Sequence, residues 1–152
     1  MEKSVITILS LIAFVGGFLI FYNPKPASSP TQENSSVSNT QQKWESKVDD
    51  QTSVTVTVTP SDLSAESGEW KFDIVMSTHS VELDQDMTKV AILVDDFDKE
   101  YSPIRWEGAP AGGHHREGVL IFAPVAPYPQ DLKLNIKDIG GVQRLFSWIL
   151  VK

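Results

Sequence analysis

From Thr52 onward, apolar residues alternate with polar ones, and this period of two constrains the fold more than any other feature of the chain. Val54, Val56 and Val58 alternate with threonines up to Pro60. Every second side chain of an extended segment points to the same face, so this pattern predicts a strand with one buried face. No long stretch with helical spacing competes for the apolar residues. We therefore expect an all-β fold.

Similar strand signals recur along the chain, separated by turn residues such as the aspartates at 95 and 96 and the glycine pair at 140 and 141. The predicted strands are 52–59, 70–77, 89–94, 101–106, 118–123, 131–137 and a last one that contains Phe146, Trp148 and Leu150. Pro103 interrupts the fourth of them. Seven short strands within about 100 residues are typical of a single antiparallel sandwich made of two sheets.

The N-terminal residues predict how the sandwich is attached. Residues 5–21 are almost free of charge, and a run of about 17 apolar residues is the lower limit for a helix that spans a bilayer. The small residues needed for signal-peptide cleavage appear only from Ala27, behind two prolines. We predict that residues 1–22 are an uncleaved signal anchor, a transmembrane helix, with a cleaved signal peptide as the alternative. So short a leader favours a cytoplasmic N-terminus, which places the rest of the chain outside the cytoplasm.

Residues 23–43 are rich in Ser, Thr, Asn, Gln and Pro and contain almost no large apolar side chain. Such a segment cannot bury enough surface to offset the entropy lost on ordering, so we predict a disordered linker. Trp44 ends this pattern, and we expect its ring to cover an edge of the core. The predicted organisation is thus an anchor at 1–22, a linker at 23–43 and a β-sandwich domain at 44–152.

Composition excludes several function classes. The formal net charge of −7 repels phosphate backbones, which argues against nucleic acid as a partner. The chain has no cysteine, so it has neither disulfides nor thiolate chemistry, and a blue-copper centre with a Cys ligand is excluded. The domain must be stable through its core alone.

The three histidines are the candidate metal ligands. His79 follows the second predicted strand, and His114 and His115 follow Gly112-Gly113. Imidazoles are the commonest protein ligands for copper and zinc, so three that converge would form a site. Adjacent residues of an extended chain point to opposite sides, however, so only one of His114 and His115 joins His79 unless the loop turns sharply. The competing hypothesis is structural, with the imidazoles and Arg116 hydrogen-bonded to backbone carbonyls.

Other chemistry finds less support in the sequence. Met76 shares the register of Trp70 and Ile74, so we interpret it as core rather than as a copper ligand. The acidic clusters at 84–86 and 95–100 do not match a helix–loop–helix calcium loop, so solvated turns are expected there. No nucleophile elbow, phosphate loop or His-Glu-x-x-His motif occurs. We do not expect an enzyme.

Three segments stand out as wholes, namely 78–83, 106–120 with its Gly-Gly-His-His-Arg stretch, and 137–142. With them the chain, from about Trp44 to its end, resembles a family of small exported or membrane-anchored prokaryotic proteins of unassigned activity. The resemblance implies an immunoglobulin-like or cupredoxin-like sandwich and carries no catalytic residues across.

Together these observations favour a binding or interaction module at the cell envelope, tethered to the membrane and recognising a ligand or protein that the sequence does not name. The expected contact surface is formed by 78–83 and 106–116, because Trp and Arg are the residue types that most often anchor interfaces. A copper- or zinc-handling module is the alternative. The residues expected at this surface are His79, Trp106, His114, His115 and Arg116, of which the three histidines are the candidate metal ligands.

Overall fold

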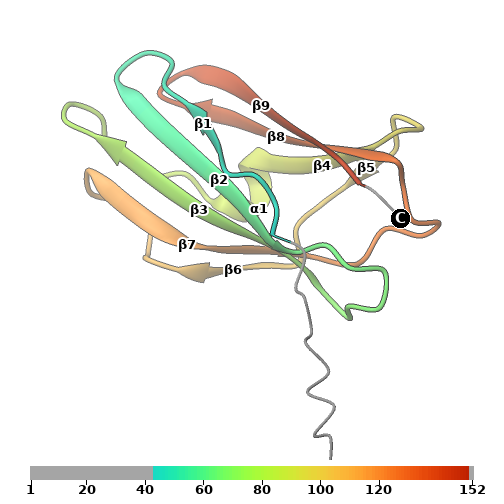
Figure 1. Ribbon diagram of the computed structural model, residues 1–152. Helices are drawn as coiled ribbons and strands as arrows, with labels where there is room; N and C mark the ends of the chain where they lie inside the picture. The colour runs from blue at the N-terminus through green and yellow to red at the C-terminus, as the bar shows by residue number, and fades with distance from the viewer. Residues whose placement is uncertain (1–42, 151–152) are drawn as a thin grey trace, which may run out of the picture. The chain divides into compact units, whose positions relative to one another are not determined.

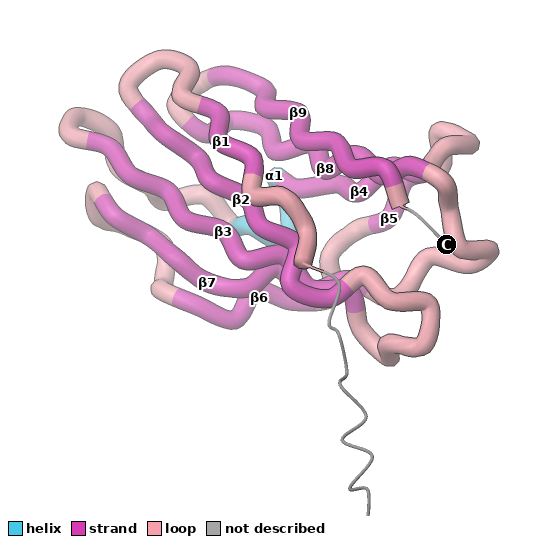
Figure 2. Tube along the Cα trace, in the orientation of Figure 1, coloured by secondary structure: helices cyan, strands magenta, loops and turns pink. Residues whose placement is uncertain are grey.

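The computed structural model describes residues 43–150, which belong to one compact unit with an all-β architecture. Two antiparallel sheets form a sandwich (Figure 1), and Figure 2 shows that strands dominate it. The described residues also form one short helix. This architecture confirms the predicted all-β class with two antiparallel sheets, although the described residues form nine strands rather than seven. The predicted anchor and nearly all of the predicted linker lie outside the described residues. Within 43–150 no helix is long and apolar enough to cross a membrane.

The strands are distributed unevenly between the sheets. The larger sheet has the order β1-β2-β3-β7-β6, and the smaller has the order β5-β4-β8-β9. The bounds in the larger sheet are β1 Lys47–Asp49, β2 Val54–Asp62, β3 Trp70–Thr78, β6 Arg105–Gly108 and β7 His115–Phe122. Those in the smaller sheet are β4 Ala91–Asp95, β5 Glu100–Tyr101, β8 Asp131–Ile139 and β9 Val142–Ile149, and the helix α1 spans Met87–Val90.

The core lies between the sheets and follows the period of two. Along β3 every second residue from Trp70 to Met76 is buried, as the alternation predicted. Phe72 meets Phe122 edge to face at 5.6 Å between ring centroids, and it lies at the same separation from Trp148 of the other sheet. Trp44 is buried as expected, and it belongs to the same apolar cluster. These aromatic contacts join the two sheets into one core.

The predicted fourth strand, 101–106, is wrong as a single strand. Its first part is β5, where Tyr101 pairs with Leu93, and its second part is β6, where Trp106 pairs with Leu120. The chain therefore passes from one sheet to the other between them. Pro103 lies at this crossing, and proline has no N–H with which to continue a ladder.

Other boundaries differ for local reasons. The predicted strand at 89–94 begins as α1, because the Asp86 carboxylate caps this turn by accepting the Thr88 backbone N–H at 3.0 Å. β7 begins at His115 rather than at residue 118. Pro60 lies inside β2 rather than at its end, next to a register shift between Pro60 and Asp62. Bulges of this kind are where a sheet tolerates proline.

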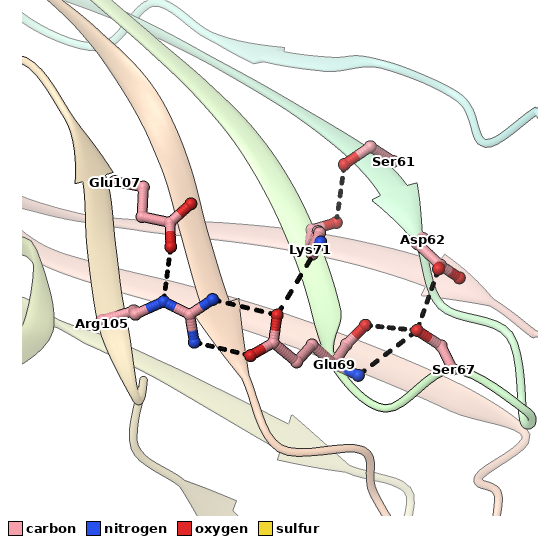
Figure 3. A network of polar contacts seen from close by, with 7 residues as sticks. All are labelled: Ser61, Asp62, Ser67, Glu69, Lys71, Arg105 and Glu107. Atoms are coloured by element: carbon pink, nitrogen blue, oxygen red, sulfur yellow. Dashed lines mark hydrogen bonds and ion pairs between the residues drawn. The ribbon is translucent and has the colours of Figure 1, made fainter.

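A network of polar side chains on the larger sheet ties its edge strand β6 to Glu69, the residue just before β3 (Figure 3). The Arg105 guanidinium donates to both Glu69 carboxylate oxygens, at 2.6 and 3.0 Å, and to Glu107 at 2.6 Å. The hydrogen bond from Arg105 holds the pKa of Glu69 below its usual value, and these same contacts raise the pKa of Arg105. The network satisfies its own charges, so it is a structural feature rather than an open site.

Candidate functional site

The two segments expected to form a contact surface, 78–83 and 106–116, lie side by side at one end of the sandwich. The backbone N–H of Thr78 donates to the His114 carbonyl at 2.9 Å. Further along, Leu83 donates to the Gly113 carbonyl at 3.0 Å, and Gly112 donates to the Leu83 carbonyl at 2.8 Å. These bonds continue the pairing of β3 with β7 beyond the strand ends, near the tips of both strands in Figure 1. The loops therefore form one backbone-bonded unit.

Arg116 holds this unit together from inside. It faces Met76 in the β3–β7 register and is only 3% exposed. Its guanidinium donates to three backbone carbonyls, those of Gln85 at 2.6 Å, Ala109 at 3.1 Å and Leu83 at 3.4 Å. Burial lowers the pKa of Arg116, against the charge of Asp86, which raises it. The predicted bonding to backbone carbonyls is thus found at Arg116, but the side chain is not presented at the surface.

Trp106 is half-buried and fixed in place by its neighbours. Its indole N–H donates to the Ala109 carbonyl at 2.9 Å, and the Arg116 guanidinium lies 5.2 Å from its ring centroid, a cation–π contact. The ring packs against the facing glycines of β6 and β7, since a Cβ at Gly118 would stand 2.6 Å from Cζ2 of Trp106. Glycine at these two positions lets the ring approach the backbone closely.

The three histidines are exposed. His115 opens β7, and its Nε2 lies 3.7 Å from Oε2 of Glu117. Within residues 43–150 no imidazole bonds a backbone carbonyl, so the structural hypothesis is wrong for the histidines and right for Arg116. The imidazoles instead lie at the surface of the two hydrogen-bonded segments, 78–83 and 106–116.

Nothing in the described residues gathers these histidines into a metal centre. No group of three or more histidine or carboxylate side chains in 43–150 is placed to hold a metal ion. In the acidic cluster at 95–100, Asp95 stabilises the turn itself. Its carboxylate accepts the backbone N–H groups of Phe97 and Lys99, each at 2.9 Å, and the Tyr101 hydroxyl at 2.8 Å. Binding of copper or zinc by His79, His114 or His115 stays a prediction without a structural cluster behind it.

We expect stoichiometric Cu(II) or Zn(II) to leave the melting temperature of residues 44–152 unchanged within about one degree, because a ligand stabilises a fold only if the native state binds it. Thermal melts with metal and with chelator, on the wild type and on His79→Ala, test this. A chelator-sensitive rise of several degrees that disappears in His79→Ala would instead establish the metal module.

Two residues that matter at this end were missed by the sequence reasoning. The Glu82 carboxylate accepts the Gly113 backbone N–H at 2.5 Å, which fixes a glycine pair with φ of 118° and 80°. Arg144 is fully buried below the neighbouring hairpin turns and bonds to Asp49, Gln51 and Ile139. For Arg144 the sequence did contain a signal of burial, because alternation places Arg144 on the same face of its strand as Phe146.

Comparison with known proteins leaves the family open. No protein-family model matches the chain, and no curated protein matches it. Among solved structures, the 1.5 Å crystal structure of a secreted protein from Mycobacterium tuberculosis, MPT63, is similar, with 13% sequence identity and a TM-score of 0.40. The match covers 70% of this chain and 92% of that one. A likeness this slight carries no information on function.

Proposed function

We propose that this chain is a membrane-tethered, extracytoplasmic binding module whose contact surface is the histidine end, defined as residues 78–83 and 106–116. The observation that carries the proposal is that exposed histidine side chains project from a backbone that is held in place by hydrogen bonds. His79 and His114 lie on loops, His115 opens β7, and all three are exposed. The backbone groups of these loops bond one another and Arg116. A surface that is ordered before contact loses little entropy on binding, which favours recognition.

The residue types at this surface fit recognition better than catalysis. Trp106 presents the exposed part of a fixed ring, and the three histidines of the same two segments offer both hydrogen-bond donors and acceptors. Among the acidic residues within and just after residues 78–83, Glu82 accepts the Gly113 backbone N–H and Asp86 caps α1. We therefore propose a partner or ligand at the cell envelope and no reaction. The sandwich is, on this proposal, of the immunoglobulin-like or cupredoxin-like kind that the sequence resemblance implies.

Site-specific photocrosslinking in the producing cells tests the contact surface. A photoreactive residue placed at His79 or His114 should give a discrete crosslinked species, because both positions lie on the proposed surface. The same residue at Glu66 is the matched control, since Glu66 is also exposed but lies in the loop between β2 and β3 at the opposite end. Equal crosslinking from all three positions, or none from the histidine positions, would count against this surface.

The tether is a separate part of the proposal and rests on residues 5–21. We expect the full-length chain to stay with the membrane fraction after high-salt and carbonate washes, because a spanning helix is not extracted by either. Immunoblotting of the washed membranes is the measurement. A soluble form that begins near Ala27 or Ser28 would show that the segment is a cleaved signal peptide.

A further inference from the structure

Strand β9 is an unusually unprotected sheet edge. It spans eight residues, and no strand in residues 43–150 pairs with its free side. Its outward side chains are Gln143, Leu145, Ser147 and Ile149, none of them charged. Leu145 is 59% exposed and Ile149 is 78% exposed. Proteins usually protect such edges with charge, proline or cover, and β9 has neither proline nor an outward charged side chain. Such an edge is suited to pairing with another strand.

A groove runs along the second half of this edge. The segment just before β1 passes beside β9, where the Trp148 indole N–H donates to the Glu45 carbonyl at 2.8 Å. The groove has a volume of about 640 Å³. Its lining includes Lys43 and Trp44 from this segment, Lys133 from β8, and Ser147, Trp148 and Ile149 from β9.

The charge of the groove is opposite to that of the whole chain. Lys47 is paired with Glu45 at 2.7 Å, but Lys43 and Lys133 have no acidic partner among the described residues. Asp131 is the remaining acid in the lining, which leaves the groove with one net positive charge in a chain of net charge −7. Screening limits the influence of distant carboxylates to about 8 Å at physiological salt, so a bound group mainly meets these lysines.

We propose that this groove binds an extended acidic peptide, which adds to the free edge of β9 as a further strand of the smaller sheet. Backbone bonds to β9 supply the pairing, and alternate carboxylates of the peptide meet Lys43 and Lys133. Lys133 pairs with Ser147 across β8 and β9, so its long side chain passes over a small neighbour toward the added strand. Apolar side chains of the peptide cover Leu145 and Ile149.

The lysines favour this occupant over two others. A second copy of the chain would bring its own β9, whose outward side chains include no carboxylate, and would leave Lys43 and Lys133 without partners. The chain's own residues 23–42 contain a single acidic residue, Glu33. An acidic peptide from elsewhere satisfies both lysines. This surface lies away from the histidine end and does not depend on the function proposed for it.

The test uses the detergent-solubilised full-length chain and a fluorescein-labelled nine-residue peptide of alternating Glu and Val, followed by fluorescence anisotropy. We expect saturable binding that weakens about tenfold or more in Lys133→Glu, because the change places a repelling charge in the groove. Lys137→Glu is the matched control, since Lys137 is the other lysine of β8 and is exposed but does not line the groove. A peptide with Lys in place of Glu should not bind, and backbone N-methylation at alternate residues should abolish binding of the acidic peptide.

Four results would overturn the proposal. They are the absence of binding by the acidic peptide, undiminished binding of the N-methylated peptide, equal effects of Lys133→Glu and Lys137→Glu, and a dimer in sedimentation that Ser147→Pro dissociates. The last result would assign the edge of β9 to a second copy of the chain.

Discussion

Replacing Arg144 with alanine should lower the free energy of unfolding by about 3–5 kcal/mol, the usual cost of removing one partner of a buried charge pair. Arg144 has no exposed surface, and its guanidinium donates to the Asp49 carboxylate and to the Asp49 carbonyl at 3.1 Å. It also donates to the Gln51 carbonyl at 2.8 Å and to that of Ile139 at 3.3 Å. Alanine would leave these acceptors without their donor and open a cavity between two hairpins.

Urea unfolding of residues 44–152, followed by tryptophan fluorescence, measures this loss. Gln143→Ala is the matched control, because Gln143 is exposed on the same strand and should change stability by less than about 0.5 kcal/mol. A loss below about 1 kcal/mol for Arg144→Ala would show that the hairpins do not depend on this side chain.

The same clamp has a pH dependence through Asp49. Partial burial opposes ionisation of this carboxyl, but hydrogen bonds from Gln51 and the charge of Arg144 outweigh it and hold its pKa below the usual value. A lowered folded-state pKa gives stability that is complete above the unfolded value of about 3.9 and is lost as pH falls through the folded value. Acid should therefore destabilise the wild type more steeply than Asp49→Asn below about pH 4.

For the two buried arginines, Arg116 and Arg144, the alternating pattern predicts burial of the side chain but not its hydrogen-bond partners. Arg144 shares its face with Phe146 and Trp148, and Arg116 shares its face with Leu120 of β7. Each arginine occupies a position of the alternating pattern whose side chain faces the core. A charged residue at an otherwise apolar position of a strand was therefore the sequence signal for a buried guanidinium group. Their partners were out of reach, because Asp49 lies 95 residues from Arg144 in the chain and only the folded sheets bring them together.

The strands that the sequence failed to predict are those set by tertiary pairing. β1 has only three residues and was not predicted, and β5 has only two and was merged with β6, because segments this short have too few residues for an alternating pattern to be recognised. Long alternating segments such as β3 were predicted to within a residue because their own side chains define the buried face. The division of 101–106 between two sheets depends on which neighbours Tyr101 and Trp106 meet, and no local pattern carries that information.

At the histidine end the sequence predicted the segments but not their contacts. Residues 78–83 and 106–116 were expected to lie together, and the bonds of Thr78 and Leu83 to the glycine–histidine loop show how they do so. The exposure of His115 follows from its pairing with Ser77, which places it on the outer face of the sheet. A register of this kind cannot be obtained from the spacing of histidines.

Trp70→Ala should also lower the free energy of unfolding by about 3–5 kcal/mol, the range measured for large-to-small changes of buried aromatic residues. Trp70 has no exposed surface, its indole N–H donates to the Ser64 carbonyl at 3.0 Å, and its ring meets Tyr128 edge to face at 5.8 Å. Alanine removes the ring from the core and leaves the Ser64 carbonyl without its donor. Trp70→Phe keeps an aromatic ring in this place and should lower the free energy of unfolding by less than Trp70→Ala. Trp148→Ala should lower it by about as much as Trp70→Ala, because Trp148 is also buried. Urea unfolding of residues 44–152, followed by circular dichroism, compares the three variants. A loss below about 1 kcal/mol for Trp70→Ala would contradict the burial of this ring in the core.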